Sequence, residues 1–292
     1  MSTEIAAARP ADGTPRPLSV GVVKLASCDG CQLALLGLGP LLLDLGAHFR
    51  IAEFGEASSE RSDGPFDVLL VEGSVSTEEQ AHHLQHLRER SALLVTIGAC
   101  AAAGGIQALR GWATESVAPV VYAHPEWVDA LPTVTPVADH VKVDAELRGC
   151  PIDGGQLVEL LTAVRVGRRP QLPDEAVCAA CKRAGTVCVV VAKGEPCLGP
   201  LTRTGCGALC PAWGRGCYAC FGPRESANVA GEARNLRWLG LDDAGIARRL
   251  SLFTAWAPAF REAIDARGGP PGFGPRSAVV PASGAPPEEA PR

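Results

Sequence analysis

Residues 178–220 read CAACKRAGTVCVVVAKGEPCLGPLTRTGCGALCPAWGRGCYAC, and they constrain how the second half of the chain can fold. The segment contains eight cysteines, begins and ends with a C-x2-C pair, and contains no histidine. It is rich in Gly and Pro and poor in large side chains, so it cannot form an apolar core of its own. We therefore expect its thiolates to bind metal, and the bound metal to hold the segment together.

Four more cysteines lie far apart in the first half of the chain. They are Cys28, Cys31, Cys100 and Cys150. The total of twelve divides into three groups of four, which makes three four-thiolate sites the first hypothesis. We expect a cytoplasmic protein, because the N-terminal residues contain neither a continuous apolar segment nor a twin-arginine pair, and no apolar run reaches the length of a membrane span. In that reducing compartment cysteines serve as metal ligands or catalytic groups far more often than as disulfides.

The composition limits the classes of function. At 292 residues the chain is long enough for two domains. Its formal net charge is −5 and its basic residues are scattered, which does not favour binding to nucleic acid. Hydrophobic residues make up 47% of the chain and charged residues only 20%, and this apolar excess favours a large interface with a partner.

The first half of the chain alternates between buried strands and helices. Strand-like apolar runs occupy 18–26, 50–54, 66–74, 91–100 and part of 141–155, and helical patterns occupy 32–49 with a break near residue 39, 76–90 and 156–167. This alternation predicts an α/β fold with a doubly wound parallel sheet. The four cysteines of this half then follow strands, so we expect them to meet at the carboxyl edge of the sheet. The alternative is that Cys100 and Cys150 are ordinary buried cysteines.

The domain organisation follows from shifts in composition. We expect residues 1–17 to be disordered, 18–170 to form the sheet domain, 171–267 to form a small, loop-rich, cysteine-rich domain with C-terminal helices, and 268–292 to form a disordered tail. A polar, Pro-containing linker at 168–174 separates the two domains, and Asp242 or Asp243 is expected to cap a helix in the second.

Two metals are consistent with the cysteine-rich segment. Two C-x2-C pairs describe a four-thiolate zinc site, and the four remaining cysteines of the segment would bind a second zinc ion. Zinc would not explain the four widely separated cysteines of the sheet domain. Two 4Fe-4S clusters in the cysteine-rich segment, as in ferredoxins, together with a third in the sheet domain, would form a path for electrons. We therefore predict three 4Fe-4S clusters.

Several motifs resemble those of the small, electron-transferring subunit of nickel-iron hydrogenases. They are SCDGCQ (27–32), VEGS (71–74), IGAC (97–100), RGCPIDG (148–154), PCLGPLTRTGC (196–206), CP (210–211) and CYACFGP (217–223). The resemblance covers about residues 18–260. The resemblance is greatest to two cytoplasmic subgroups, because all twelve ligands are cysteines. One is the NAD(P)-linked, sulfhydrogenase-type subgroup, and the other is the subgroup that does not reduce the deazaflavin coenzyme. The resemblance implies a flavodoxin-like first domain that carries the proximal cluster and a second domain that carries the medial and distal clusters.

The resemblance also implies a set of ligands for each cluster. The proximal ligands would be Cys28, Cys31, Cys100 and Cys150, the medial ligands Cys206, Cys210, Cys217 and Cys220, and the distal ligands Cys178, Cys181, Cys188 and Cys197. This assignment treats the medial and distal ligands as contiguous sets. An interleaved arrangement stays open, since two-cluster ferredoxins exchange their fourth cysteine.

The implied partners are a large subunit that carries the nickel-iron site and an NAD(P)-linked flavoprotein or another acceptor beyond the distal cluster. Glu72, at the end of the strand at 66–74, would lie near the proximal cluster, where it either orients partner groups or assists proton movement, or else caps neighbouring amides. The first domain also resembles the cluster-bearing small subunit of the respiratory NADH dehydrogenase, which lacks the second domain. A zinc-stapled scaffold subunit is a third hypothesis.

Overall fold

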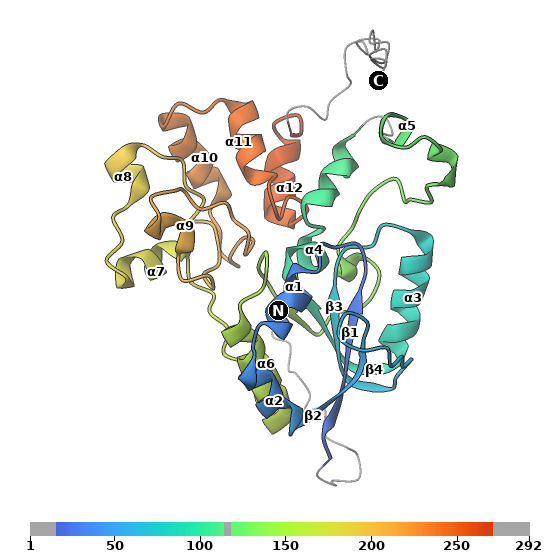
Figure 1. The fold of residues 1–292 in the computed structure, drawn as a ribbon. Helices are drawn as coiled ribbons and strands as arrows, with labels where there is room; N and C mark the ends of the chain where they lie inside the picture. Colours follow the sequence, from blue (N-terminus) through green and yellow to red (C-terminus); the bar gives the residue numbers. More distant parts are fainter. Residues whose placement is uncertain (1–15, 114–117, 271–292) are drawn as a thin grey trace, which may run out of the picture.

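The computed structural model describes residues 16–113 and 118–270. Figure 1 shows a lobe built on a β-sheet and a second lobe of short helices and loops. The two tails expected to be disordered, 1–17 and 268–292, lie almost entirely outside the described residues.

The sheet has five parallel strands in the order β2-β1-β3-β4-β5. The strands are β1 (Leu18–Lys24), β2 (Phe49–Phe54), β3 (Phe66–Glu72), β4 (Ser91–Ile97) and β5 (Ala145–Leu147). In β3 and β4 nearly every residue is buried, as the continuous apolar runs in the sequence require. The predicted α/β fold with a parallel sheet is confirmed, although β5 has only three residues within the expected run at 141–155.

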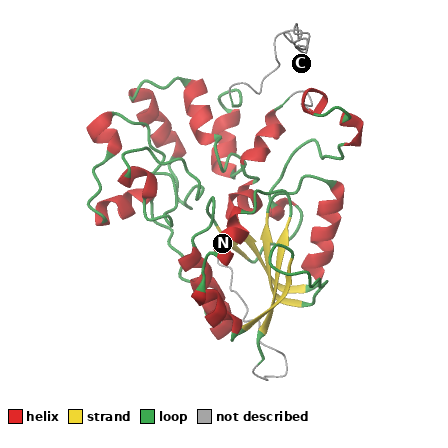
Figure 2. Cartoon of the chain, in the orientation of Figure 1, coloured by secondary structure: helices red, strands yellow, loops and turns green. Residues whose placement is uncertain are grey.

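Helices cover both faces of the sheet (Figure 2). One face packs against α1 (Gly30–Leu36), α2 (Pro40–Gly46) and α6 (Gly154–Val166), and the other against α3 (Glu78–Glu89). The break between α1 and α2 falls at Gly39, whose φ of 58° is unfavourable for other residues, and Pro40 then begins α2.

The helix expected at 76–90 begins two residues later, at Glu78. Thr77 is its N-cap, and the side chain of Thr77 accepts a hydrogen bond from the backbone N–H of Gln80. The side-chain oxygen of Gln80 in turn accepts from the backbone N–H of Ser76, so the two side chains satisfy two backbone donors at the start of the helix.

Short elements connect β4 to β5. They are α4 (Gly98–Ala103), α5 (Ala118–Val121) and the 3₁₀ helices η1 (Ile106–Trp112), η2 (Pro125–Trp127) and η3 (Val137–Asp139). Trp112 links this region to the second lobe, since its indole N–H donates to Asp265 at 2.7 Å and its ring meets that of Trp256 edge to face.

The second lobe has two parts. The cysteine-rich part contains α7 (Val177–Arg183), α8 (Val189–Lys193) and α9 (Leu209–Ala212), and the C-terminal part contains α10 (Val229–Trp238), α11 (Asp243–Leu250) and α12 (Pro258–Asp265). The three C-terminal helices share an apolar core that includes Leu236, Ile246 and Phe260. Asp242, one of the two residues expected to cap a helix here, is the N-cap of α11. Its carboxylate accepts a hydrogen bond from the backbone N–H of Gly245.

The cysteine-rich part has only a small apolar cluster, and two of its buried members are the cysteines Cys197 and Cys217. This agrees with the expectation that the segment lacks an apolar core of its own. Among the described residues, no helix is long and apolar enough to cross a membrane.

Candidate metal centres

The four cysteines of the first lobe come together at the carboxyl edge of the sheet. Cys28 follows β1, Cys31 lies in the first turn of α1, Cys100 lies in α4, and Cys150 lies in the loop after β5. Burial raises the pKa of Cys31, and the negative charges of Glu72, Cys100 and Cys150 raise it further. Burial likewise raises the pKa of Cys100 to about 11, with Cys150 and Cys28 among the further causes.

Glycines make room for these thiols. A Cβ atom on Gly98, whose φ is 88°, would lie 2.4 Å from the Cys31 sulfur. A Cβ atom on Gly105 would lie 2.6 Å from the Cys100 sulfur. Any other residue at these positions would displace the sulfur, so the local sequence keeps space free around the set.

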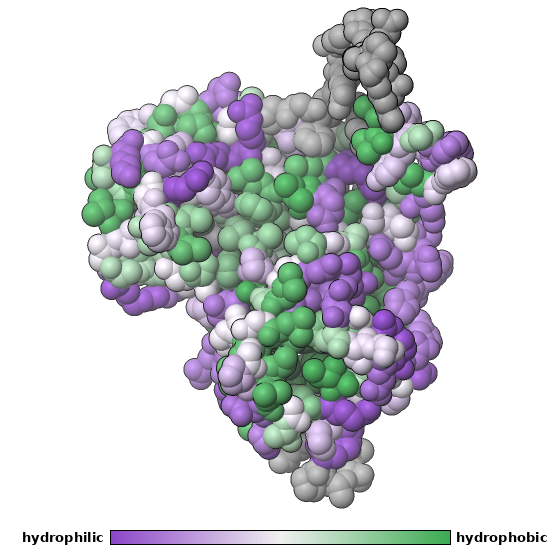
Figure 3. Space-filling model, viewed as in Figure 1, coloured by the Kyte–Doolittle hydropathy of each residue, from purple (hydrophilic) through white to green (hydrophobic). Residues whose placement is uncertain are grey.

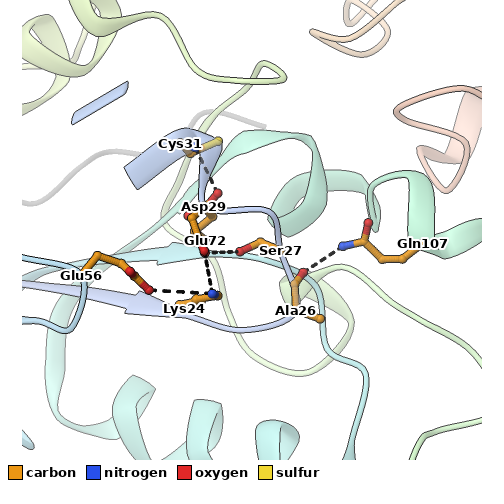
Figure 4. A network of polar contacts seen from close by, with 8 residues as sticks. All are labelled: Lys24, Ala26, Ser27, Asp29, Cys31, Glu56, Glu72 and Gln107. Carbon is orange, nitrogen blue, oxygen red and sulfur yellow. Dashed lines mark hydrogen bonds and ion pairs between the residues drawn. The ribbon is translucent and has the colours of Figure 1, made fainter. Parts of the chain in front are cut away.

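Glu72 ends β3 beneath the loop that carries Cys28 and Cys31. Its side chain is 2% exposed, and its Oε1 accepts a hydrogen bond from the backbone N–H of Cys31 at 3.1 Å, as Figure 4 shows. Its Oε2 has no hydrogen-bond partner among the described residues. The carboxylate therefore caps one amide, and its second oxygen faces neither water nor a donor.

An ion-pair network holds the adjoining loop in place (Figure 4). The Lys24 ammonium lies 2.7 Å from the Asp29 carboxylate and 3.7 Å from that of Glu56. Asp29 occupies the left-handed region with a φ of 67°, and this conformation turns the chain between Cys28 and Cys31.

Gln107, which sequence reasoning did not single out, joins three segments of the site. Its Nε2 donates to the backbone oxygen of Ala26 at 2.8 Å and to the hydroxyl oxygen of Ser74 at 2.9 Å. Its Oε1 lies 3.9 Å from the Cys100 sulfur. Nothing in the sequence around residue 107 indicates this role, because its two hydrogen bonds reach Ala26 and Ser74, which are more than thirty positions away along the chain.

Cys178, Cys181, Cys188 and Cys197 form a second group of neighbouring thiols. Cys178 and Cys181 lie in α7, Cys188 is the N-cap of α8, and Cys197 is buried. Burial raises the pKa of Cys178 to about 11, and the charges of the three other thiols contribute. The Cys197 sulfur accepts backbone N–H groups of Cys217 at 3.2 Å and Gly199 at 3.4 Å, so polar donors already face this sulfur.

Cys206, Cys210, Cys217 and Cys220 form a third group. Burial raises the pKa of Cys220 to about 12, and the charges of Cys206 and Cys210 raise it further. Burial also raises the pKa of Cys217 to about 12, with Cys197 and Cys220 as further causes.

The three groups are adjacent in a fixed order. Cys220 of the third group is near Cys150 of the first, because the charge of Cys150 raises the pKa of Cys220 while a backbone hydrogen bond from Cys150 lowers it. Cys206 of the third group is close enough to Cys181 of the second to raise its pKa, although burial and two nearer thiols contribute more. The group at 206–220 therefore lies between the two others.

Phe221 fills the junction between the first and third groups. Its ring is 4% exposed and lies 3.0 Å from the Cβ position of Gly149 and 2.3 Å from that of Gly205. These glycines directly precede Cys150 and Cys206. The two lobes are thus in close contact at the point where their thiols approach each other.

Glu232 of α10 is a buried carboxylate that sequence reasoning missed. It is 6% exposed, its charge raises the pKa of Cys178 and Cys197, and its Oε2 accepts a hydrogen bond from the Asn235 side chain at 3.2 Å. Burial raises its own pKa. The helical pattern around residue 232 could reveal a helix but not which set of thiols its carboxylate approaches.

The thiols are not spaced for a single metal ion. Across residues 16–113 and 118–270, which include all twelve cysteines, no three His, Cys, Asp or Glu side chains are placed to hold one ion. Glycines lie beside the sulfurs of Cys31 and Cys100 in the first group, and backbone N–H groups face the Cys197 sulfur of the second. Thiolates are the ligands that iron-sulfur clusters use.

Comparisons with known proteins agree with this geometry. The family model of the NADH ubiquinone oxidoreductase 20 kDa subunit matches residues 28–164. The delta subunit of sulfhydrogenase 2 from Pyrococcus furiosus is 39% identical over 82% of this chain and 100% of its own length. A subunit of the F420-non-reducing hydrogenase vhu from Methanocaldococcus jannaschii is 30% identical over 75% of this chain and 87% of its own.

Solved structures show the same fold. A chain of an NAD+-reducing [NiFe]-hydrogenase in the H2-reduced state has a TM-score of 0.51 and 28% identity, over 54% of this chain and 96% of that one. A chain of the actinobacterial-type NiFe-hydrogenase from Ralstonia eutropha H16 has a TM-score of 0.50 and 18% identity over 80% of this chain and 91% of that one, and it shows the fold alone.

The sheet, its cysteine-lined edge and these relatives define an oxidoreductase subunit of the iron-sulfur class. Within that class, the chain belongs to the family of hydrogenase small subunits, as its motifs predicted. The respiratory alternative shares only the first lobe, since the matched region ends at residue 164.

Proposed function

We propose that this chain is the electron-transfer small subunit of a cytoplasmic nickel-iron hydrogenase and that it binds three 4Fe-4S clusters in a row. The observation that carries the proposal is the order of the three groups of thiols. Phe221, next to Cys220 of the third group, contacts Gly149, which directly precedes Cys150 of the first. The backbone N–H of Cys217 of the third group donates to the Cys197 sulfur of the second at 3.2 Å. An ordered row of this kind suits the passage of electrons through the chain.

The ligand sets follow from this order. Cys28, Cys31, Cys100 and Cys150 would hold the proximal cluster, Cys206, Cys210, Cys217 and Cys220 the medial one, and Cys178, Cys181, Cys188 and Cys197 the distal one. The contiguous assignment is supported by Cys178, whose pKa is raised by burial and by the thiols of Cys197, Cys181 and Cys188. In the same proposal, residues 18–170 form the proximal-cluster domain and 171–267 the two-cluster domain.

When bound, such clusters exchange single electrons at potentials that burial and hydrogen bonds to sulfur set. The residues of this chain shape that environment. The backbone N–H groups of Gly199 and Cys217 face the Cys197 sulfur, and Gln107 donates a hydrogen bond to Ala26 in the loop before Cys28. Phe221 packs against Gly149 and Gly205 and excludes water from the contact between the lobes.

The four cysteines of the first lobe support clusters over zinc. Two four-thiolate zinc sites would use all eight cysteines of residues 178–220 and would leave Cys28, Cys31, Cys100 and Cys150 unexplained. The zinc-stapled scaffold is therefore the less favoured function, and a colour measurement distinguishes it, since zinc proteins are colourless.

An apolar surface beside the first group of thiols supports a large partner subunit. Leu33 of α1 is 62% exposed and Leu43 of α2 is 79% exposed, and Cys28 and Cys150 nearby are exposed as well. Figure 3 shows apolar side chains gathered over the region where Figure 1 places α1 and α2. Patches of this kind mark subunit contacts. The nickel-iron site would lie on the large subunit that covers this surface.

The acceptor beyond the distal cluster would be an NAD(P)-linked flavoprotein or an equivalent electron carrier. The similarity to a hydrogenase described as NAD-reducing supports a nicotinamide-linked enzyme, and the similarity to sulfhydrogenase and F420-non-reducing hydrogenase subunits is compatible with other acceptors.

The native complex provides the test. It would be purified anaerobically from its host, its subunits weighed and its nickel measured, and hydrogen-dependent reduction of NAD, NADP and a viologen dye assayed. We expect nickel, a second large subunit and dye reduction. A complex that lacks nickel and does not reduce the dye with hydrogen would overturn the proposal.

A further inference from the structure

The side-chain amide of Gln107 is anchored through its nitrogen and faces the sulfur of Cys100 with its oxygen. Its Nε2 donates to the backbone oxygen of Ala26 at 2.8 Å and to the Ser74 hydroxyl oxygen at 2.9 Å, and Figure 4 shows the first of these bonds. Its Oε1 is the atom that lies 3.9 Å from the Cys100 sulfur. The amide is thus held between the loops that follow β1 and β3 on one side and α4 on the other.

The hydrogen-bond partners determine which end of the amide faces the sulfur. A backbone carbonyl oxygen only accepts hydrogen bonds, so the group beside the Ala26 oxygen must be the NH2 group of Gln107. The Ser74 hydroxyl donates to the same Ala26 oxygen at 3.3 Å, and its own oxygen is then free to accept from Nε2. The reverse orientation would place the Gln107 oxygen against the Ala26 oxygen, and two acceptors in contact are unfavourable.

Gly105 leaves the space in which the amide oxygen and the sulfur approach each other. A Cβ atom at this position would lie 2.8 Å from the Gln107 Oε1 and 2.6 Å from the Cys100 sulfur. The φ of 68° at Gly105 also favours glycine. The gap between the amide oxygen and the sulfur therefore stays free of other side chains.

The amide oxygen directs a partial negative charge at the Cys100 sulfur. An electron that enters a cluster bound there adds negative charge to the cluster and its sulfur ligands, and the negative end of a nearby dipole opposes that step. An N–H donor in the same place would have the opposite effect, because it would stabilise the added charge. The orientation of the Gln107 amide thus fixes the sign of its effect on the cluster.

We propose that Gln107 is a positioning residue for electron transfer, which aims its amide oxygen at Cys100 and so keeps the reduction potential of the proximal cluster low. The inference rests on the proposed function, because it needs a 4Fe-4S cluster at the first group of thiols. Electrons move towards higher potential, so a low value at this cluster favours transfer from the proximal to the medial cluster.

The test measures the reduction potential of the proximal cluster in the native complex, by potentiometric titration followed by electron paramagnetic resonance. The proximal signal is the one that Cys100→Ser alters. Gln107→Met keeps the length of the side chain but removes its dipole, and the potential should rise by roughly 60 mV, a tenfold change for a one-electron couple. Gln85→Met, the same change on the exposed side of α3, is the matched control and should leave the potential unchanged.

Ser74→Ala is a second variant, which leaves Gln107 itself in place. It removes one of the two acceptors of Nε2, so the amide is held less firmly and the potential should rise by a smaller amount than in Gln107→Met. The iron content of both variants should equal that of the unaltered complex. Loss of iron in both would show that these contacts hold the cluster rather than set its potential, and would overturn the inference.

The two proposals fail in different ways. If the unaltered complex lacks nickel and does not reduce the viologen dye with hydrogen, the proposed function is wrong. If dye reduction and iron content are normal, but Gln107→Met leaves the proximal potential unchanged or lowers it, the inference about Gln107 is overturned. A lowered potential would show in addition that Nε2, and not Oε1, faces the sulfur.

Discussion

The carboxylate of Glu72 and the backbone N–H of Cys31 form a buried hydrogen bond of 3.1 Å, and this bond links the end of β3 to the first turn of α1. One oxygen of Glu72 is thereby occupied and the other is left without a partner among the described residues. The free oxygen is the feature that simple capping of an amide does not explain, because an unpaired buried oxygen costs stability.

Replacing Glu72 by Gln tests whether the free oxygen has a function. The amide oxygen of Gln can still accept from Cys31, so we expect iron content to be preserved. If the carboxylate moves protons or orients groups of the large subunit, hydrogen-dependent dye reduction by the assembled enzyme should fall by about tenfold or more. Unchanged turnover would leave only the capping role.

Replacing Gly98 by Ala should damage one cluster selectively. The new Cβ would lie 2.4 Å from the Cys31 sulfur, and the φ of 88° disfavours any residue with a Cβ. We expect the purified subunit to lose roughly a third of its iron, the share of one cluster of three. Gly46→Ala is the matched control, because a Cβ there meets nothing within 4 Å. Iron loss in both variants, or in neither, would contradict the proposed position of the proximal cluster.

Replacing Glu232 by Gln should raise the reduction potential of the distal cluster. A buried negative charge near Cys178 and Cys197 disfavours the reduced, more negative state, and its removal should shift the potential upward by roughly 60 mV, a tenfold change for a one-electron couple. Potentiometric titration followed by electron paramagnetic resonance measures the shift. Glu262→Gln, on the exposed side of α12, should leave the potential unchanged. Equal potentials in Glu232→Gln and the unaltered protein would show that this carboxylate does not affect the cluster.

The ion pair between Glu159 and Arg168 predicts a pH-dependent contribution to stability. Hydrogen bonds from Arg168 and from the backbone of Gln171 lower the pKa of Glu159 from 4.5 to about 2. A lowered pKa stabilises the folded state above pH 4.5, and the contribution is lost as the pH falls from there towards 2. Because solvent screens this exposed pair, we expect the contribution to be small.

Anaerobic thermal unfolding checks this contribution. Arg168→Ala should lower the unfolding midpoint at pH 7, and the difference from the unaltered protein should begin to shrink below about pH 5. A difference that grows as the pH falls would have the wrong sign. Arg165→Ala, in the last turn of α6, provides the control.

The sequence predicts where the strands lie better than it predicts how long they are or what packs around them. The runs at 66–74 and 91–100 are apolar throughout because helices cover both faces of the sheet, and β3 and β4 were therefore identifiable. The length of β5 depends on its pairing with β4, which spans only Ala145–Leu147. Cys100 was expected at the end of a strand but lies in α4, because Gly98 turns the chain before it.

The thiols of the site could be named from the sequence, but their neighbours could not. Spacing and motifs singled out the cysteines and Glu72. The side chains of Gln107 and Glu232 reach the thiols only because the chain folds back on itself, and no local pattern indicates such long-range contacts.

The content of iron and acid-labile sulfide tests the central claim most directly. The subunit would be prepared anaerobically and both elements measured together with zinc. Three four-iron clusters predict about twelve iron and about twelve sulfide per chain, and negligible zinc. Tightly bound zinc with negligible sulfide would contradict the account.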